Sequence, residues 1–214
     1  SQAGSGAGRS QSLAVSVPYI MCTCYAGMNI NEVGSEAQKR ELLPRIADGK
    51  LIFAYGLTEP DVGSDLGSVK TSAVREGDEL VINGAKRFCS GADEADYIYA
   101  LVCSDRAGQR YKNLSFVLIP PSAPGVTVTA FECMGVRGIH TTDVTFDNVR
   151  VPIGNLVGGE EAWNRGWDML AGPGLDVEKI EVAAIALGVA WAALEDAWQY
   201  AQERKQFGKA IGTY

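Results

Sequence analysis

Histidine is nearly absent from this sequence: His140 is the only one among 214 residues, and 26 acidic against 19 basic residues give a formal net charge of −7. A Ser-His-Asp hydrolase would have to use His140, yet this residue lies in a Gly-Ile-His-Thr-Thr segment, and the chain has no Gly-x-Ser-x-Gly motif. A nucleic-acid-binding protein needs a basic surface, which an acidic chain does not offer. We therefore expect neither that hydrolase chemistry nor a nucleic-acid partner, and we assign His140 to a loop.

Cysteine is too sparse and too irregularly spaced for a disulfide scaffold. The count is odd and no pair has the spacing Cys-x-x-Cys, which is typical of free thiols in a reducing compartment. Cys22 and Cys24 have no cluster of His or Cys beside them, so we predict no metal site. The five cysteines are Cys22, Cys24, Cys89, Cys103 and Cys133.

Long apolar runs are missing as well. No segment reaches the roughly 20 residues that a membrane-spanning helix needs. The N-terminus shows neither a basic segment before an apolar core nor an Arg-rich transit pattern, so we expect no membrane partner. With 46% hydrophobic and 21% charged residues, the composition is that of an ordinary globular protein whose length allows one or two domains.

The residue pattern in the middle of the chain is typical of a β-domain. Short runs rich in Val, Ile, Thr and aromatic residues alternate with turn residues, and no helical pattern lies between them. About seven strands at this spacing indicate an antiparallel barrel or sandwich. The predicted strands are 51–57, 69–74, 79–89, 96–102, 114–119, 126–133 and 142–146.

Helical patterns lie on either side of this block. Residues 1–9 are rich in Gly, Ser and Ala, which is typical of a flexible segment, and 10–30 read as one or two helical pieces interrupted by Pro18. Ser35 and Gln38 form a capping box that predicts a helix over 36–48, and 160–170 read as a short helix. From residue 175 an apolar stripe in steps of three and four predicts a long bundle helix, with Gly208 as its left-handed C-cap.

The segment Tyr55–Asp65 is the most informative part of the chain. It begins in a strand-like run and continues into a turn built from Pro60 and Gly63. A glycine lets backbone approach a ligand closely, and free amides at such a turn can hold an anion. The segment therefore suits a phosphate or a flat polar ring, although its composition also fits a plain acidic turn. Its polar side chains are Thr58, Glu59, Ser64 and Asp65.

The order of these residues resembles the first signature of the acyl-CoA dehydrogenase family. Five further motifs follow in family order, so that the resemblance covers roughly residues 20–214. They are Asn83-Gly84-x-Lys86, Met134-Gly135-x-Arg137-Gly138, Phe146-Asp147-Asn148-Val149-Arg150-Val151-Pro152, Leu175-Asp176, and Glu203-Arg204-Lys205-Gln206-Phe207-Gly208.

The resemblance implies an α+β fold in which an antiparallel barrel or sandwich lies between N-terminal helices and a long C-terminal bundle helix. We expect residues 1–50 to end a helical domain, 51–158 to form the middle β-domain, and 159–214 to begin a helical bundle. Family members are nearly twice as long, so we expect a partial chain whose single long helix cannot bury its stripe alone.

The resemblance also implies bound FAD and oxidation of an acyl-CoA thioester to its 2-enoyl form. Phe88, Cys89 and Ser90 correspond to a family segment that usually reads Trp-Ile-Thr, where the hydroxyl lies near flavin N5. Without the resemblance, Phe88 fits core packing equally well, and residues 203–205 fit a solvated helix end. The implied cofactor residues are Tyr55, Leu57, Thr58, Gly63, Ser64, Phe88, Cys89, Ser90, Arg204, Gln206 and Phe207, of which the last three would reach the FAD of a neighbouring subunit.

The catalytic base is implied less directly. In most members it is a glutamate that would lie beyond Tyr214, whereas a minority carry it in a Leu-Asp-x-Glu-Arg pattern. Here that pattern reads Leu-Asp-Val-Glu-Lys and makes Glu178 the candidate. Asp176, Lys179 and Ser64 are implied as substrate contacts.

Two other readings remain open. A relative with the same scaffold could act as an acyl-CoA oxidase, a flavin monooxygenase or a desulfinase, and a chain that ended at Tyr214 could be a binding or assembly subunit. The leading reading implies an electron-transfer flavoprotein as acceptor, a homo-oligomer such as a dimer of dimers, and a bacterial cytoplasm or mitochondrial matrix. The acyl chain length is not readable from the sequence.

Overall fold

The computed structural model describes residues 16–214, so the predicted flexible segment 1–9 lies outside the described residues. Residues 16–20 are helical and continue through a π-helix, η1 (Met21–Gly27), into α2 (Met28–Val33). Helical backbone therefore includes Pro18, and the described part of 10–30 is one helical piece, the first of the two alternatives predicted. The capping box of Ser35 and Gln38 is confirmed, and α3 (Glu36–Ala47) follows it directly.

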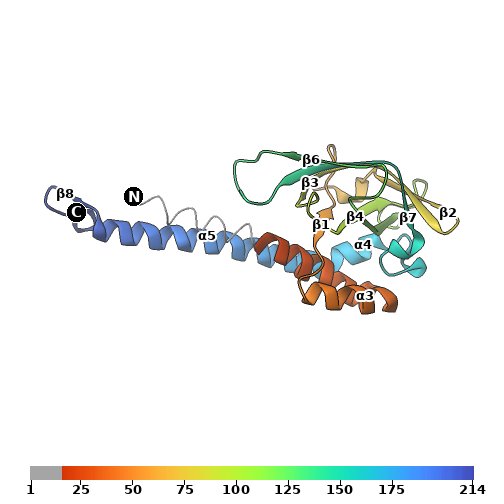
Figure 1. Cartoon of the computed structure of the whole chain (residues 1–214), viewed down its shortest axis with the longest axis horizontal. Helices are drawn as coiled ribbons and strands as arrows, with labels where there is room; N and C mark the ends of the chain where they lie inside the picture. The colour runs from red at the N-terminus through yellow and green to blue at the C-terminus, as the bar shows by residue number, and fades with distance from the viewer. Residues whose placement is uncertain (1–15) are drawn as a thin grey trace.

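A seven-stranded sheet forms the body of the molecule (Figure 1). Its strand order is β1-β4-β2-β3-β7-β6, with β5 paired to β4. Most pairs are antiparallel, as predicted, but β1 and β2 both pair with β4 in parallel, so the sheet is mixed. The strands are β1 (Phe53–Gly56), β2 (Ser72–Glu76), β3 (Glu79–Ser90), β4 (Tyr97–Cys103), β5 (Leu114–Ile119), β6 (Val126–Phe131) and β7 (Thr141–Pro152).

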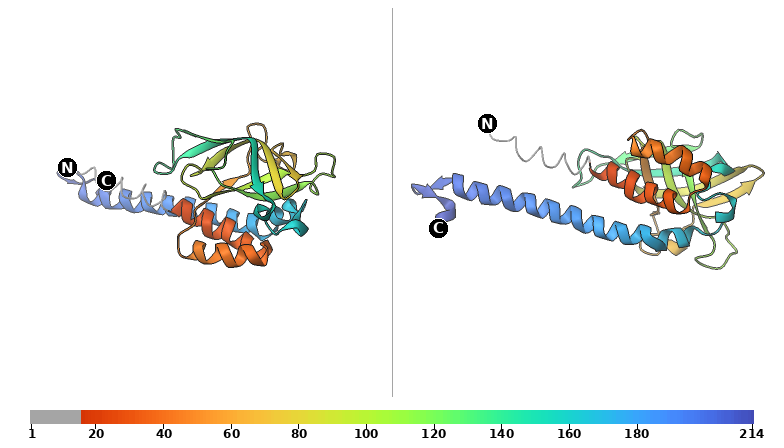
Figure 2. Two further views of the ribbon diagram at one scale, coloured as in Figure 1. Left: turned by 45° about the vertical axis from the view of Figure 1, so that its right-hand side comes forward. Right: turned by 90° about the horizontal axis from the view of Figure 1, so that it is seen from below.

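Alternating side chains on β4 build two apolar clusters, one on each face of the sheet. Tyr99 and Leu101 pack with α2 and α3, whereas Ile98, Ala100 and Val102 pack with residues of β3, β5 and β7. Successive residues of a strand point to opposite faces, so a strand that is buried on both sides must be apolar throughout. The α+β prediction is confirmed, with the helices covering one face of the curled sheet (Figure 2).

The C-terminal part begins with short helical turns, continues in a long helix and ends in a small hairpin and one more helical turn. The turns are η3 (Ile153–Asn155), η4 (Glu160–Ala162), α4 (Gly166–Met169) and η5 (Leu170–Gly174), with η2 (Leu66–Ser68) earlier in the chain. The helix α5 (Leu175–Glu203) then extends away from the body of the molecule (Figures 1 and 2). A small hairpin, β8 (Lys205–Gln206) and β9 (Lys209–Ala210), follows it and leads to η6 (Ile211–Thr213).

The prediction that Gly208 forms the C-cap of the long helix was wrong. The helix ends at Glu203, and Gly208 lies with Phe207 at the turn of the β8–β9 hairpin. Both residues have positive φ, 51° for Phe207 and 83° for Gly208. Two central residues with positive φ define the type I′ turn, whose twist suits a two-residue hairpin loop.

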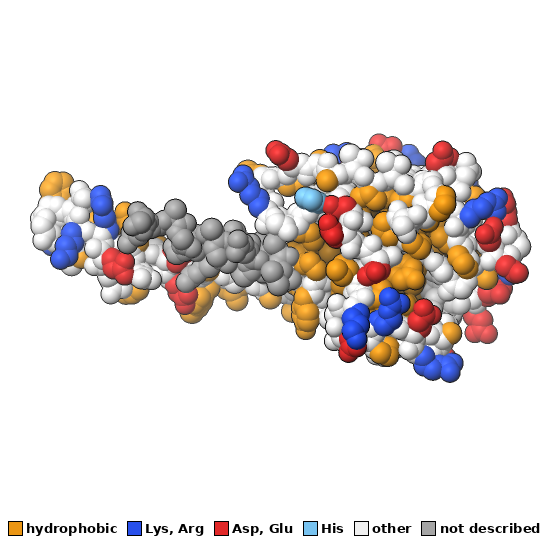
Figure 3. Space-filling model, in the orientation of Figure 1, with side chains coloured by type: hydrophobic (Ala, Val, Ile, Leu, Met, Phe, Trp, Pro, Cys, Tyr) orange, Lys and Arg blue, Asp and Glu red, His pale blue; other side chains and the backbone are white. Residues whose placement is uncertain are grey.

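Apolar side chains on α5 remain largely exposed (Figure 3). Ile180, Leu187, Trp191, Leu194 and Trp198 belong to the predicted stripe, and each is at least 61% exposed. Apolar residues elsewhere on the helix are exposed as well, including Val182, Val189 and Tyr200. A helix that is apolar on more than one side is one that other elements normally cover.

Candidate functional site

The bend after β1 is a tight turn closed by its own backbone. The N–H of Glu59 donates to the carbonyl of Val62 at 2.8 Å, and the N–H of Val62 returns a bond to the carbonyl of Glu59 at 3.1 Å. Beyond the turn, Gly63 and Ser64 are exposed, and nothing lies within 4 Å of where a Gly63 Cβ would be. The bend thus leaves backbone and a hydroxyl open to a ligand.

The predicted neighbourhood of this bend and the Phe88–Ser90 edge is confirmed. The N–H of Arg87 donates to the carbonyl of Thr58 at 2.8 Å, and Lys86 Nζ donates to the carbonyl of Leu57 at 3.1 Å. Two segments about 30 positions apart in the sequence therefore lie side by side. Within the described residues, the hydroxyls of Thr58, Ser64 and Ser90 have no hydrogen-bond partner.

A buried ion pair lies beneath the contact. Lys86 Nζ is 2.9 Å from Glu59 Oε1, and the two side chains are 0% and 5% exposed. Glu59 also accepts hydrogen bonds from the N–H groups of Lys70 at 2.7 Å and Thr71 at 2.9 Å. Burial alone would raise the pKa of Glu59, but Lys86 and these N–H groups hold it below its ordinary value. Burial lowers the pKa of Lys86, and the carboxylate of Glu59 opposes that shift.

A β-bulge shapes the edge itself. The register of β3 against β7 shifts between Lys86 and Cys89, and Phe88 in the bulge has φ 60°. Bulges re-aim side chains next to functional sites. The Phe88 ring is accordingly 54% exposed, and it meets Phe131 edge-on at 5.9 Å. The alternative interpretation, in which Phe88 packs in the core, was therefore wrong.

Unlike the exposed Phe88, Cys89 points into the apolar core. Its side chain is fully buried in the cluster of β3, β5 and β7, and burial raises the pKa of its thiol to about 12. Its carbonyl accepts a 2.7 Å hydrogen bond from Thr142 Oγ1. Any contact of Cys89 with a cofactor would have to use backbone atoms rather than sulfur.

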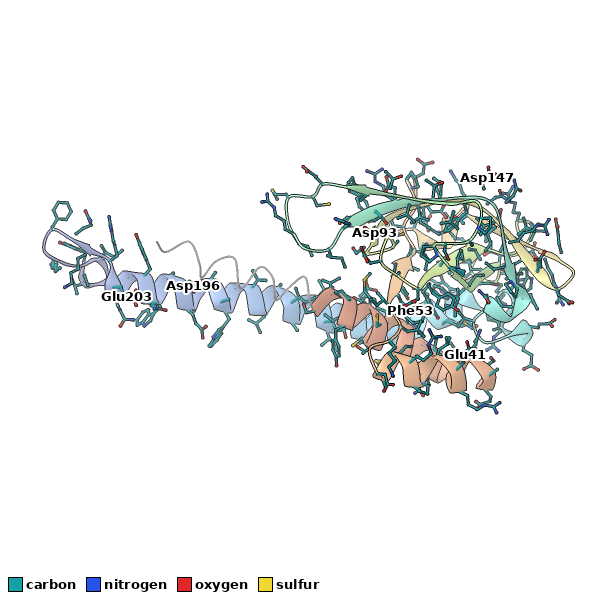
Figure 4. The ribbon with its side chains drawn as sticks, viewed as in Figure 1. Glu41, Phe53, Asp93, Asp147, Asp196 and Glu203 are labelled. Carbon is teal, nitrogen blue, oxygen red and sulfur yellow. The ribbon has the colours of Figure 1, made fainter. Side chains whose placement is uncertain are left out.

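Ser90 lies in the wall of a cavity of about 310 Å³ between the first helix, β1 and the β6–β7 loop. Its wall is apolar at Met21 and Phe53 and polar at Asp93 and His140. Figure 4 labels Phe53 and Asp93, the latter above the former in that view. Asp93 is hydrogen-bonded to His140 Nδ1, which raises the pKa of the imidazole. The loop assignment of His140 is confirmed, since β7 begins one residue later.

Aromatic rings connect the bend to the helices. Tyr55 stacks on Tyr99 with ring centroids 5.5 Å apart and lies 5.3 Å from the ring of Tyr25 in η1. Burial raises the pKa of both Tyr25 and Tyr55, and the charge of Glu178 adds to each shift. Glu178 in the first turn of α5 thus faces two tyrosines from different elements. Burial, then repulsion from Glu181, raises the pKa of its carboxyl.

The remaining predicted residues are arranged differently. Asp176 and Lys179 are exposed and form an ion pair at 3.1 Å. Arg204, Gln206 and Phe207 lie beyond the far end of α5, a 29-residue helix. At about 1.5 Å per residue such a helix spans roughly 40 Å. The structure does not bring these three to the bend of their own chain, and their proposed reach to a second subunit stays a prediction.

The motif series included Lys86 but gave it no role. The signal was its position within a predicted strand: Lys86 is fully buried, although the register of β3 shifts between it and the buried Ile82. A lysine at an inward-facing position of a strand requires a buried counter-charge. Tyr25 was missed because an isolated tyrosine in a helix carries no comparable signal.

Comparison with known proteins identifies the family. Residues 54–149 match the model of the acyl-CoA dehydrogenase middle domain, and residues 164–214 match that of the acyl-CoA dehydrogenase C-terminal domain. The chain belongs to the acyl-CoA dehydrogenase family. The domain boundaries at residues 50 and 158 stay predictions.

Relatives and solved structures agree with this assignment. A probable acyl-CoA dehydrogenase of Bacillus subtilis is 37% identical over 182 residues, which cover 85% of this chain and 47% of that protein. The glutaryl-coenzyme A dehydrogenase–glutaryl-CoA complex has a TM-score of 0.84 at 32% identity and covers 95% of this chain and 50% of its own. A glutaryl-CoA dehydrogenase of Mycobacterium smegmatis in complex with FADH2 has a TM-score of 0.78 at 30% identity, over 89% of this chain and 47% of its own. The chain spans about half the length of these relatives.

Within residues 16–214, no helix combines the length and apolarity that crossing a membrane requires. No group of three or more His, Cys, Asp or Glu side chains in the same range could hold a metal ion.

Proposed function

We propose that this protein is an FAD-dependent enzyme that oxidises an acyl-CoA thioester to its α,β-unsaturated form. The observation that supports the proposal is the contact between the Thr58 bend and strand β3 at Lys86 and Arg87, directly before the Phe88–Ser90 edge. Next to this contact, Phe88 is exposed, and the hydroxyls of Thr58 and Ser90 have no hydrogen-bond partner among the described residues. This donor set fits an isoalloxazine, whose polar edge needs hydrogen bonds and whose faces need flat apolar contacts. FAD, when bound, would supply the hydride acceptor.

The residues divide the work by position. Thr58 and Ser90 would hydrogen-bond the ring, Tyr55, Leu57, Phe88 and the backbone of Cys89 would line it, and Gly63 and Ser64 would meet its pyrophosphate. Ser64, Asp176 and Lys179 would contact the CoA thioester, which makes the ion pair of the last two a contact that substrate would rearrange. Arg204, Gln206 and Phe207 would reach the FAD of a second subunit.

Glu178 would remove the α-proton of the thioester. A carboxylate with a raised pKa attracts a proton from carbon more strongly than an ordinary one. Its half-buried position in the first turn of α5, close enough to Tyr25 of η1 to raise the pKa of that tyrosine, supports this role.

The partners and compartment belong to the same proposal. The homo-oligomer, which we take to be a dimer of dimers, follows from the proposed reach of Arg204, Gln206 and Phe207 to the FAD of a second subunit. An electron-transfer flavoprotein would reoxidise the flavin. All five cysteines lie within the described residues and none is disulfide-bonded, which supports a reducing compartment such as a bacterial cytoplasm or mitochondrial matrix.

The test is anaerobic reduction of the full-length protein by acyl-CoA substrates. We expect the flavin of the wild type to lose its colour. The Glu178→Gln variant should still bind FAD, but its flavin should be reduced at least a hundredfold more slowly, since general bases contribute about 10²–10⁴-fold. Bleaching of the Glu178→Gln protein at the wild-type rate would remove Glu178 as the base. A full-length protein that cannot take up FAD would overturn the proposed function itself.

A further inference from the structure

The ammonium group of Lys86 binds both sequence neighbours of Thr58, namely Leu57 and Glu59. Lys86 Nζ donates to the carbonyl of Leu57 and to the carboxylate of Glu59, at 3.1 Å and 2.9 Å. The next residue of β3, Arg87, donates its N–H to the carbonyl of Thr58. Three consecutive residues of the bend are therefore tied to two consecutive residues of one strand.

Those ties fix the bend where regular structure has ended. Strand β1 stops at Gly56, so Leu57 and Thr58 have no sheet pairing to place them. The carboxylate of Glu59 also accepts from the backbone of Lys70 and Thr71, which anchors it to the segment entering β2. The pair thus joins the bend, the segment before β2, and β3 at one buried point.

Neither partner reaches the surface where a ligand would lie. Both side chains are at most 5% exposed, whereas Thr58 and Ser90 are partly exposed. Lys86 and Ser90 belong to the same strand, with the β-bulge between them. Buried ion pairs contribute little net stability compared with well-packed apolar replacements. The pair is therefore better explained by the positions that it fixes than by the stability that it adds.

We propose that Lys86 and Glu59 are positioning residues that hold the hydroxyl of Thr58 in register with Phe88 and Ser90, so that one flavin ring meets both segments at once. The proposal rests on the proposed function, because it assigns the two segments a shared ligand. It adds two residues that act through Thr58 without touching the ligand.

The experiment compares two variants of the full-length holoprotein that disturb the same strand. Lys86→Met removes the ammonium group and keeps an unbranched apolar side chain, whereas Leu80→Ala opens a cavity at the other end of β3, where Leu80 is fully buried. FAD affinity is measured by titrating the apoprotein well below both unfolding midpoints, together with the visible absorption spectrum of the bound flavin. We expect Lys86→Met to raise the Kd for FAD at least tenfold and to shift the spectrum. Leu80→Ala should lower the unfolding midpoint while its Kd stays within twofold of the wild type.

Equal Kd values and unchanged spectra in both variants would overturn the positioning role and leave the pair a purely structural one. If Lys86→Met does not fold, Glu59→Gln takes its place, because it removes the charge that holds Lys86 and turns one of the two acceptor oxygens into a donor while keeping the size of the side chain. Wild-type affinity in Glu59→Gln would then overturn the proposal. Failure of the proposed function looks different, since the wild type itself would bind no FAD.

Discussion

At the scale of single residues, burial decides which polar groups can take part in chemistry. Thr58 and Ser90 keep unpaired hydroxyls near the surface, whereas the thiol of Cys89 is fully buried with a raised pKa. The sequence analysis listed all three side chains as cofactor contacts. It could not separate the buried Cys89 from Ser90, because the alternation of inward and outward side chains cannot be read through a bulge. The bulge between Lys86 and Cys89 is what separates Phe88 from its neighbour.

The single histidine offers a direct test at this scale. Asp93 raises the pKa of His140, so the ion pair contributes stability that is fully present below the ordinary histidine pKa of about 6.5 and is lost as pH rises through the folded value. We expect the imidazole proton resonance, the only one in the chain, to titrate above pH 6.5, and Asp93→Asn to bring it back toward that value. A wild-type midpoint at or below that of Asp93→Asn would contradict the pairing. Arg137→Gln in the same loop is the matched control and should leave the midpoint unchanged.

At the scale of elements, most strands and the α3 cap followed from local signals, since alternation and a Ser-x-x-Gln pattern need no tertiary information. The parallel pairing of β1 with β4 did not, because orientation depends on how the chain returns to the sheet rather than on the strand residues. The end of α5 at Glu203 was missed because Gly208 has the same positive φ in a hairpin turn as in a helix cap.

Gly84 is the glycine on which strand β3 depends most. It has φ 143° beside a register shift, and an added Cβ would lie 2.6 Å from the Cα of Thr71. We expect Gly84→Ala to destabilise the protein by about 1–3 kcal/mol, from the strained φ and the clash together. Gly154→Ala is the control, since nothing lies within 4 Å of its Cβ position and its φ is not positive. Denaturant unfolding that gives both variants the same midpoint would contradict this reading.

At the scale of the whole molecule, the exposed apolar surface of α5 is the face that further helices of the bundle are expected to cover. Figure 4 labels Asp196 and Glu203 on the projecting part of this helix, far from Phe53 in the body. The stripe was predicted from spacing, but its exposure, and the further apolar residues beside it, emerge only from the structure.

We therefore predict that Leu194→Glu destabilises the helical bundle of the full-length protein. Leu194 is 61% exposed here, and burying a leucine contributes about 1.5–3 kcal/mol, so placing a charge there should lower the free energy of unfolding by at least that amount. Denaturant unfolding measures this. Gln202→Glu on the same helix adds the same charge at a polar position and should leave stability near the wild-type value. Equal effects of the two substitutions would place the packing face of α5 elsewhere.

The central claim is that the Thr58 bend and the Phe88–Ser90 edge grip one flavin together. Titration of FAD into the full-length apoprotein, compared between the wild type and Thr58→Val/Ser90→Ala, tests it most directly. Each lost hydrogen bond is worth about 0.5–1.5 kcal/mol, so we predict that the double variant binds FAD roughly 5- to 150-fold more weakly. Wild-type affinity in the double variant would contradict the claim.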